Sequence, residues 1–257
     1  MLLSDPFVFA AVLAVVGACT GVLSGLFGVG GGMLVIPATL TLFQVRGMTA
    51  GDAMHLAAGV SLMTTVPTAL SSLRAHARHG AVDVAAIRLW APLVVAGSIL
   101  GGLMASHLPG TVLALVFGIY LAGIACLLGF FPPERRILAR EPGNAAKRLA
   151  AFVIGFCAAV LGIAGGTITV PTLVLFRTPI HRAVGTAPAI GLLVALPAAS
   201  VFVASQLMAG AGVTIRLALL CVLVLACCTV PMARVGARIA HKLHADRLRH
   251  AFAVVLF

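Results

Sequence analysis

Long uncharged, mostly apolar runs dominate the chain. They extend from Pro6 to Val45, from Leu89 up to Glu134, from Leu149 to Phe176, from Ala183 to Ile215 and from Leu217 to Ala233. Each is close to or longer than the roughly 18 to 20 residues that a helix needs to cross a bilayer, and several could cross twice. Because the runs lack the apolar and polar alternation of a membrane β-barrel, the pattern predicts an all-α, polytopic integral membrane protein.

Composition and charge agree with this prediction. The 257 residues are 61% hydrophobic and 9% charged, whereas roughly a quarter of a soluble domain is charged. The net charge of +11 comes from Lys and Arg that lie between the apolar runs, so we interpret it as a topology signal and expect no nucleic-acid partner. The six cysteines show no metal-ligand spacing, and the sequence predicts neither a metal site nor a cofactor.

A glycine-rich motif interrupts the first apolar run. The stretch "GVLSGLFGVGGGMLVIP" (21–37) places four glycines within five residues. Glycine costs roughly 1 kcal/mol in a helix interior, so we expect the helix to break here. The free N–H groups and the dipole of the next helix would then suit an anion. The alternative is that glycines allow close helix packing, which we favour for Gly17 to Gly28.

The motif has a second copy, "GFCAAVLGIAGGTITVP" (155–171), and "MHLAAGVS" (54–61) likewise matches "IHRAVGTA" (180–187). Each half of the chain therefore carries the same expected helix break followed by the same type of helix. In these alignments His55 superposes on His181, and Ala164 takes the place of Gly30. The halves are an internal duplication whose two glycine motifs are not identical.

The distribution of Lys and Arg predicts opposite orientations for the halves. Basic loops near 74–88, 135–148, 177–182 and 234–249 are expected inside, whereas loops 106–111 and 206–214 carry no Lys or Arg and are expected outside. The repeat aligns the inside loop 74–88 with the outside loop 206–214, which predicts two inverted-topology repeats and an odd number of crossings in each. We favour about five plus five helices with the N-terminus outside; three plus three remains the alternative if the glycine motifs form re-entrant hairpins.

These patterns divide the chain into three parts. Residues 1–131 form the first transmembrane repeat, 132–146 a Pro-rich, charged cytoplasmic linker, and 147–257 the second, inverted repeat. The final stretch, 251–257, is too short to span, and we expect it to lie inside the last helix of that repeat.

We expect the two breaks to meet near the membrane centre and form a site for a small oxyanion. Several hydroxyl groups lie close to the motifs in sequence, although hydroxyls in membrane helices often bond to their own helix instead. The predicted substrate-binding residues are Gly30, Gly31, Gly32, Gly165, Gly166, Ser61, Thr167 and Thr186.

Other polar residues are candidates for gating or recruitment. His55 and His181 could couple transport to protons, or could be ordinary residues at helix starts. Arg46, Arg177 and Arg182 could recruit anions at the pore mouths, although positive-inside anchoring also explains the last two. No Asp or Glu lies within an expected span, so a carboxylate proton relay is not expected.

The doubled motif "GLFGVGGGMLVIP" and "AVLGIAGGTITVP", each followed by a "HxAxG" stretch at His55 and His181, resembles the TauE/SafE sulfite exporter family over nearly the whole chain. The resemblance implies a multi-pass transporter in the bacterial inner membrane that moves small sulfur-containing or organic anions. Export of sulfite, or of sulfoacetate or a related organosulfonate, is the first expectation. Expected partners are the oxyanion, membrane lipid and a second copy in a homodimer.

Two other functional classes compete with transport. An enzyme would need a nucleophile with a base, a metal cluster or an acidic pair in the membrane, and the sequence has no HExxH or GxSxG motif. We therefore expect no enzyme activity. A passive anion channel is the stronger rival, because channels also use broken helices aimed at the midplane.

Overall fold

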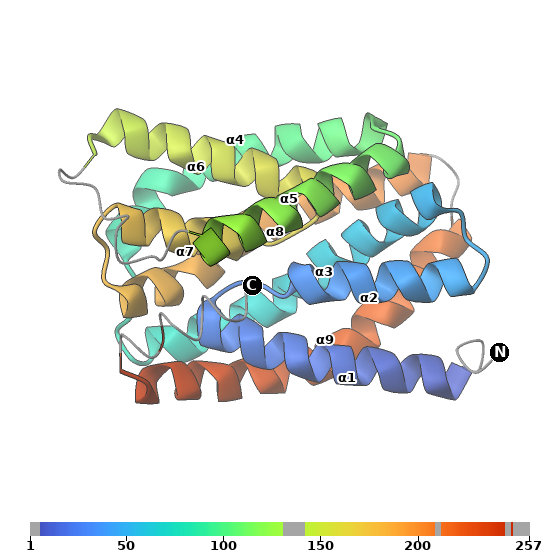
Figure 1. The fold of residues 1–257 in the computed structure, drawn as a ribbon, viewed down its shortest axis with the longest axis horizontal. Helices are drawn as coiled ribbons and strands as arrows, with labels where there is room; N and C mark the ends of the chain where they lie inside the picture. The colour runs from blue at the N-terminus through green and yellow to red at the C-terminus, as the bar shows by residue number, and fades with distance from the viewer. Residues whose placement is uncertain (1–5, 131–141, 209–211, 245–247, 249–257) are drawn as a thin grey trace.

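The computed structural model describes residues 6–130, 142–208, 212–244 and 248. This part of the chain is helical apart from short connections and contains no strand (Figure 1). Its nine helices are α1 (Pro6–Phe27), α2 (Gly32–Val45), α3 (Ala50–Ala77), α4 (Val84–His107), α5 (Gly110–Phe130), α6 (Asn144–Val160), α7 (Gly166–Leu175), α8 (Ile180–Met208) and α9 (Gly212–Lys242).

Five of these helices, α1, α3, α4, α8 and α9, are long and apolar enough to cross a membrane. By contrast, α2 has 14 residues and α7 has 10, which at 1.5 Å per residue correspond to about 21 Å and 15 Å. Neither reaches across a hydrocarbon core of about 30 Å. The first half thus has the five helices of the favoured count, but its second helix is too short to cross.

Two expectations fall partly on residues that the structure does not describe. The expected last helix, with residues 251–257, lies outside the described residues. So does most of the linker assigned to 132–146, and α6 already begins at Asn144. The helix therefore takes up the last three residues of that linker.

Close helix pairs join the two halves of the chain. Figure 1 shows α1 beside α9 along one side of the molecule and α4 beside α6 along the other, with α3 and α8 between them. A Cβ on Gly21 would lie 2.6 Å from the Thr229 carbonyl oxygen, and one on Gly155 would lie 2.2 Å from the Val94 carbonyl oxygen. Both glycines let two backbones approach closely; for Gly21 this is the packing role expected of Gly17 to Gly28, whereas Gly28 itself lies in the helix break with φ of +68°. Exchanging the halves would superpose one pair on the other; the inverted repeat itself stays a prediction.

The surface is apolar and the interior is unusually polar. Leu115, Ile119, Leu220 and Leu223 are each more than 60% exposed, whereas fifteen polar side chains of the described residues are buried, most of them Ser or Thr. A protein in water would expose fewer such large apolar residues in continuous stretches. The distribution fits helices that face lipid and pack through small and hydroxyl-bearing residues.

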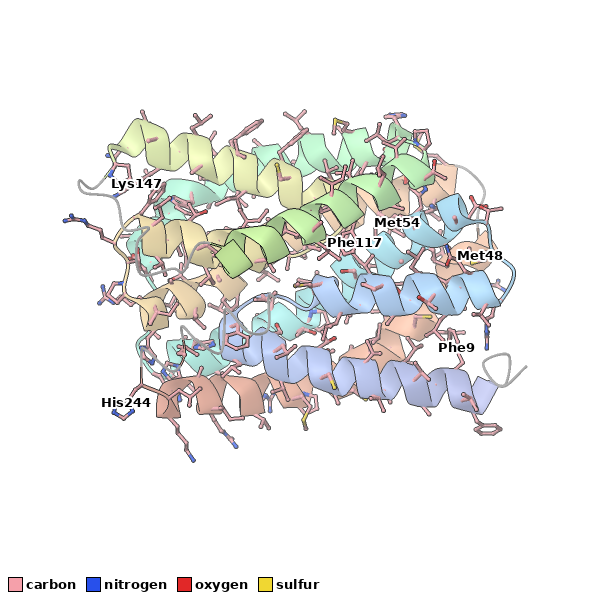
Figure 2. The ribbon with its side chains drawn as sticks, viewed as in Figure 1. Phe9, Met48, Met54, Phe117, Lys147 and His244 are labelled. Carbon is pink, nitrogen blue, oxygen red and sulfur yellow. The ribbon has the colours of Figure 1, made fainter. Side chains whose placement is uncertain are left out.

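The connections gather at two ends of the molecule. Asp83, Lys147 and Thr178 line one hollow and therefore share an end, which we call the basic end. Met48 and Gln206 line a cavity at the other, which we call the vestibule end. Figure 2 shows Lys147 and His244 at the first and Met48 and Phe9 at the second. The described loops expected inside thus lie together at the basic end.

Candidate functional site

Both glycine motifs break the helix, as the sequence predicts. Between α1 and α2, Gly28, Gly30 and Gly31 have φ of +68°, +75° and +83°. Between α6 and α7, Gly162 and Gly165 have φ of +70° and +71°. This left-handed region is accessible to glycine without steric cost, which explains why the chain uses glycine at these positions.

The two breaks are in direct contact. A Cβ on Gly30 would lie 2.1 Å from the Cβ of Ala164, and a Cβ on Gly166 would lie 2.1 Å from the carbonyl oxygen of Gly28. Gly32 faces Ile163 in the same way, at 2.9 Å. Because these glycines have no side chain to separate the two backbones, the start of each short helix packs against the break of the other half.

The other two predicted glycines face their own half of the chain. A Cβ on Gly31 would lie 2.1 Å from the Thr20 methyl carbon Cγ2, and one on Gly165 would lie 3.0 Å from the Ala158 Cβ. Each is the N-cap residue of its short helix, α2 or α7. Gly31 and Gly165 therefore shape the turn and do not form the contact between the breaks.

The first amides of α2 and α7 are unpaired. Within the described residues, two N–H groups at the start of each helix have no hydrogen-bond partner, and they belong to Gly32, Met33, Gly166 and Thr167. The next amide of each helix has a hydrogen-bond partner at the N-cap residue. Leu34 donates to the Gly31 carbonyl at 3.0 Å, and Ile168 donates to the Gly165 carbonyl at 3.0 Å. Such free donors, with the helix dipole behind them, favour an anion.

Helix α3 holds both breaks with hydroxyl groups. Ser61 Oγ donates to the Gly162 carbonyl at 2.8 Å, and Thr65 Oγ1 donates to the Gly30 carbonyl at 3.0 Å. A Ser side chain has one O–H, so Ser61 cannot donate to an anion while it makes this bond. In this structure Ser61 positions the second break.

A hydroxyl pair lies at the first turn of α7. The buried Thr167 side chain hydrogen-bonds to the phenol of Tyr120, which comes from α5. Because one O–H proton serves their mutual bond, the pair has a second O–H for a ligand. Sequence reasoning missed Tyr120: it is the only tyrosine in the chain, but it lies in an apolar run far from either motif.

Three buried hydroxyls have no hydrogen-bond partner among the described residues: Thr20, Thr64 and Thr169. Thr20 packs against Gly31 at the first break, and Thr169 lies in the first turn of α7. An unsatisfied buried donor costs about 1 to 3 kcal/mol. The positions of Thr20 and Thr169 beside the breaks therefore favour a polar occupant that would satisfy these two hydroxyls.

Thr186 makes a different contact. Its Oγ1 accepts the Asp83 backbone N–H at 2.9 Å, while the backbone of the neighbouring Gly185 packs closely on Ala81. Thr186 thus fastens the connection between α3 and α4 onto α8. It is not among the residues that the structure places against the glycines of the breaks.

A cavity of about 430 Å³ lies at the vestibule end. Its walls come from α3, α4, α5, α6 and α8, and they include Asp52, His55, Gly59, Leu62, Val160 and Phe202. Ala58 also lines it, and the Ala58 Cβ lies only 2.6 Å from where a Cβ on Gly162 would be. The cavity therefore ends one residue layer from the second break, and none of the predicted glycine or hydroxyl site residues lines it.

Comparison with known proteins identifies the family. Residues 13–257 match the family model described as "Sulfite exporter TauE/SafE". The chain belongs to the TauE/SafE family. A "Probable membrane transporter protein" of Haemophilus influenzae is 26% identical over 77% of this chain and 75% of its own length, and "Probable membrane transporter protein MJ0441" of Methanocaldococcus jannaschii is 30% identical over 67% and 64%. No solved structure matches. The protein is a multi-pass membrane transporter.

The two candidate histidines of this TauE/SafE protein lie at opposite ends. His55 lines the vestibule cavity, with its Nδ1 3.2 Å from the Gly51 carbonyl oxygen. His181 lies at the basic end, where its Nε2 donates to the Leu243 carbonyl at 3.1 Å. Neither histidine touches the glycine breaks.

The candidate arginines of this family member lie at its two ends. The Arg46 guanidinium carbon lies 3.9 Å from the centre of the Phe9 ring, an arrangement typical of a cation–π contact. Arg46 does not line the vestibule cavity, although its contact with Phe9 places it at that end of the molecule, where Figure 2 shows Phe9. Arg177 and Arg182 are exposed at the basic end, on either side of the start of α8.

Proposed function

We propose that this TauE/SafE protein exports a small sulfur oxyanion, sulfite first, across the bacterial inner membrane by alternating access. The observation that carries the proposal is the direct contact between the two helix breaks, in which the start of α7 packs on Gly28 and the start of α2 packs on Ile163. Each half of the chain contributes unpaired N–H groups beside this contact, and Thr167 adds its hydroxyl pair with Tyr120. The family description and the expected topology support the substrate class and the membrane.

Neutral donors suit a site that must both bind and release an anion. Backbone amides and hydroxyls replace water around the oxyanion, and the helix dipoles add partial positive charge. A fixed cation in a dry site would hold the anion far more strongly. The membrane potential then favours exit of an anion by about 2.3 kcal/mol per charge per 100 mV.

The conformation corresponds to one side of an alternating-access cycle. The vestibule cavity reaches from the expected outside to the layer formed by Ala58 and Val160, and below it the breaks close against one another. We infer that the opposite state opens a cavity from the basic end and closes the vestibule. Separation of the breaks would create the volume for the anion.

Ligand-dependent thermal stabilisation tests the substrate class. The purified protein is heated with sulfite, sulfate, thiosulfate, sulfoacetate, lactate or chloride at fixed ionic strength. A ligand at 100 times its Kd stabilises the folded state by about 2.7 kcal/mol. We expect sulfite or a sulfonate to give a selective shift, and we expect Thr167→Val and Tyr120→Phe to reduce it.

Thr172→Val is the matched control. Thr172 also lies on α7, but its Oγ1 donates to the Ile168 carbonyl within the same helix, at 2.7 Å, so the variant should respond like the wild type. Equal responses in all folded variants would remove Thr167 and Tyr120 from the site. In proteoliposomes, saturable exchange of labelled sulfite supports a transporter, whereas unsaturable conductance would establish the channel alternative.

A further inference from the structure

Four histidines converge at the basic end of the molecule. His76 ends α3, His79 follows it, His181 begins α8 and His241 ends α9. The His241 ring centre lies 5.0 Å from that of His76, 4.1 Å from that of His79 and 6.3 Å from that of His181. The described residues hold no group of three or more ligands placed for a metal ion, so this cluster calls for a different explanation.

His76 connects the cluster to the first helix break. Its side chain is fully buried, and its Nε2 lies 2.8 Å from the Gly25 carbonyl oxygen. Because α1 ends at Phe27, the Gly25 carbonyl is one of the last four and has no partner in its own helix. His76 supplies that partner and thereby caps the helix that the glycine motif interrupts.

The hydrogen bonds fix where the protons lie. A carbonyl oxygen only accepts, so His76 Nε2 carries a hydrogen. Neutral His76 therefore offers a lone pair on Nδ1, which lies 3.0 Å from His241 Nε2. His241 must donate from Nε2 and has its own Nδ1 lone pair free. The partly exposed ring is thus the entry point for a proton, and the buried ring is the inner position.

We propose that His76 and His241 form a proton relay that couples anion transport to proton movement, an inference that rests on the proposed function. A proton binds at His241 Nδ1, and the proton on His241 Nε2 passes to His76 Nδ1. His241 is then neutral and protonated on Nδ1, and His76 is a cation that still donates to Gly25. The reverse sequence releases one proton, so the relay is balanced.

The surrounding charges link proton binding to the anion. Helix α1 brings no charged side chain, and its carbonyl end favours a cation at His76, whereas burial of the ring disfavours one. The other elements at this end bring mainly basic groups: Arg74, Arg78 and His79 beside α3, His181 and Arg182 on α8, and Arg234, Arg238 and Lys242 on α9. Asp83, on the connection to α4, accepts a hydrogen bond from the Ala86 backbone N–H through its Oδ1. An arriving anion would offset the repulsion, so each ligand favours the other.

Hydroxyl contacts extend from the histidines toward the breaks. Ser72 Oγ donates to the Ser24 carbonyl at 3.4 Å, and Thr68 Oγ1 lies 2.6 Å from Thr229 Oγ1 on α9. One turn further along α3, Thr65 holds the first break itself. A shift of α3 caused by charging His76 would therefore act on α1, α9 and the break together.

Transport in proteoliposomes tests the relay. Labelled sulfite flux and lumenal pH are recorded together, with and without an imposed pH gradient. We expect the gradient to drive sulfite accumulation in the wild type, and expect His76→Gln and His241→Gln to retain counterflow without a gradient but to lose the gradient-driven component. Sulfite itself can carry a proton, but these variants leave its chemistry unchanged. His244→Gln, an exposed histidine at the same end, should behave as the wild type.

Gradient-driven accumulation that survives in folded His241→Gln would overturn the relay, as would wild-type sulfite flux without proton movement. If His76→Gln does not fold, gradient-driven accumulation in the His241→Gln variant decides the test, because His241 is partly exposed and its substitution is less disruptive. Absence of wild-type counterflow would contradict the proposed function instead, and the relay is then judged without substrate by nitrogen NMR of ¹⁵N-histidine. We expect His241→Gln to change the tautomer or titration of His76, and an unchanged His76 signal would overturn the proposal.

Discussion

The two helix breaks share a backbone design but differ in their surroundings. Gly28 and Gly162 have nearly the same φ, and the N-cap residues Gly31 and Gly165 have similar φ. Each break also has one carbonyl that accepts a hydrogen bond from its own hydroxyl on α3. The second residue of the helix that follows is Met33 after the first break and Thr167 after the second. Only the second short helix therefore carries a hydroxyl at this position, and that hydroxyl is paired with Tyr120.

This difference separates two roles that glycine plays in the motif. Positive φ is needed to turn the chain, and it recurs in both halves. Absence of a side chain is needed where one break packs on the other. At this contact the halves differ, because the second half has Ala164 at the position of Gly30, and the two residues face each other. The duplication preserves the turn, while the hydroxyl at the second residue of the short helix occurs in the second half alone.

The largest effect is expected from Gly166→Ala. The new Cβ would lie 2.1 Å from the Gly28 carbonyl oxygen and 2.6 Å from the Val29 Cα, and neither backbone atom can move without shifting the first break. We expect the free energy of unfolding to fall by about 3 kcal/mol or more, the upper range for overpacking. Thermal unfolding in detergent measures it.

Gly118→Ala is the control for this comparison. Gly118 lies on α5, and a Cβ there meets nothing within 4 Å. The substitution should be neutral or stabilise by up to about 1 kcal/mol through helix propensity. If Gly166→Ala were as harmless as Gly118→Ala, the contact between the breaks would be looser than the structure shows.

A second prediction compares the two N-cap glycines. Gly31→Ala and Gly165→Ala each force an L-residue into positive φ, which costs about 1 to 2 kcal/mol. Gly31→Ala also drives a Cβ to 2.1 Å from the Thr20 Cγ2, so its loss of stability should be greater. Adding Thr20→Ser removes that methyl group and should recover about 1 kcal/mol.

Placing Thr20→Ser in the other glycine background provides the discriminating measurement. Thr20→Ser combined with Gly165→Ala should give additive losses, because the two sites share no contact. Recovery in both glycine backgrounds, or in neither, would show that Thr20 does not pack on the first break.

The breaks were predictable from sequence, whereas their supports were not. Four glycines in five residues within an apolar run predict a helix break, and the second copy of the motif predicts a second break. Ser61, Thr65 and Tyr120 act through contacts between distant segments: Ser61 reaches Gly162 across 101 positions, for example. A local pattern carries no information on such contacts, and any hydroxyl in a membrane helix looks alike in sequence.

Histidines show the same limit. The repeat alignment predicts roles for His55 and His181, yet His76 is the histidine that is fully buried among the described residues, and it caps α1. Its partner His241 lies 165 residues away, and neither belongs to a motif. Internal symmetry identifies positions that the duplication preserved, but it cannot identify a residue that serves only one half.

A third prediction tests the α3 hydroxyls as equivalent supports. Ser61→Ala leaves the Gly162 carbonyl without its donor, and Thr65→Val does the same to the Gly30 carbonyl. Each should lower the free energy of unfolding by about 1 to 2 kcal/mol, the cost of an unsatisfied buried group. Thr39→Val, whose hydroxyl bonds only within α2, should change stability by less. A loss confined to one variant would mean that α3 supports one break alone.

The smallest effect on stability is expected at Arg46, the C-cap residue that follows α2. Arg46 lies over Phe9, so Arg46→Gln should reduce stability by about 0.5 to 1 kcal/mol, the range for an exposed cation–π contact. A double-mutant cycle with Phe9→Leu isolates that term from the packing of the ring. Because the guanidinium is engaged with Phe9 and lies outside the cavity lining, the KM for sulfite should not change. A higher KM whose difference from wild type disappears at high salt would restore Arg46 as an anion-recruiting residue, because screening removes such long-range attraction.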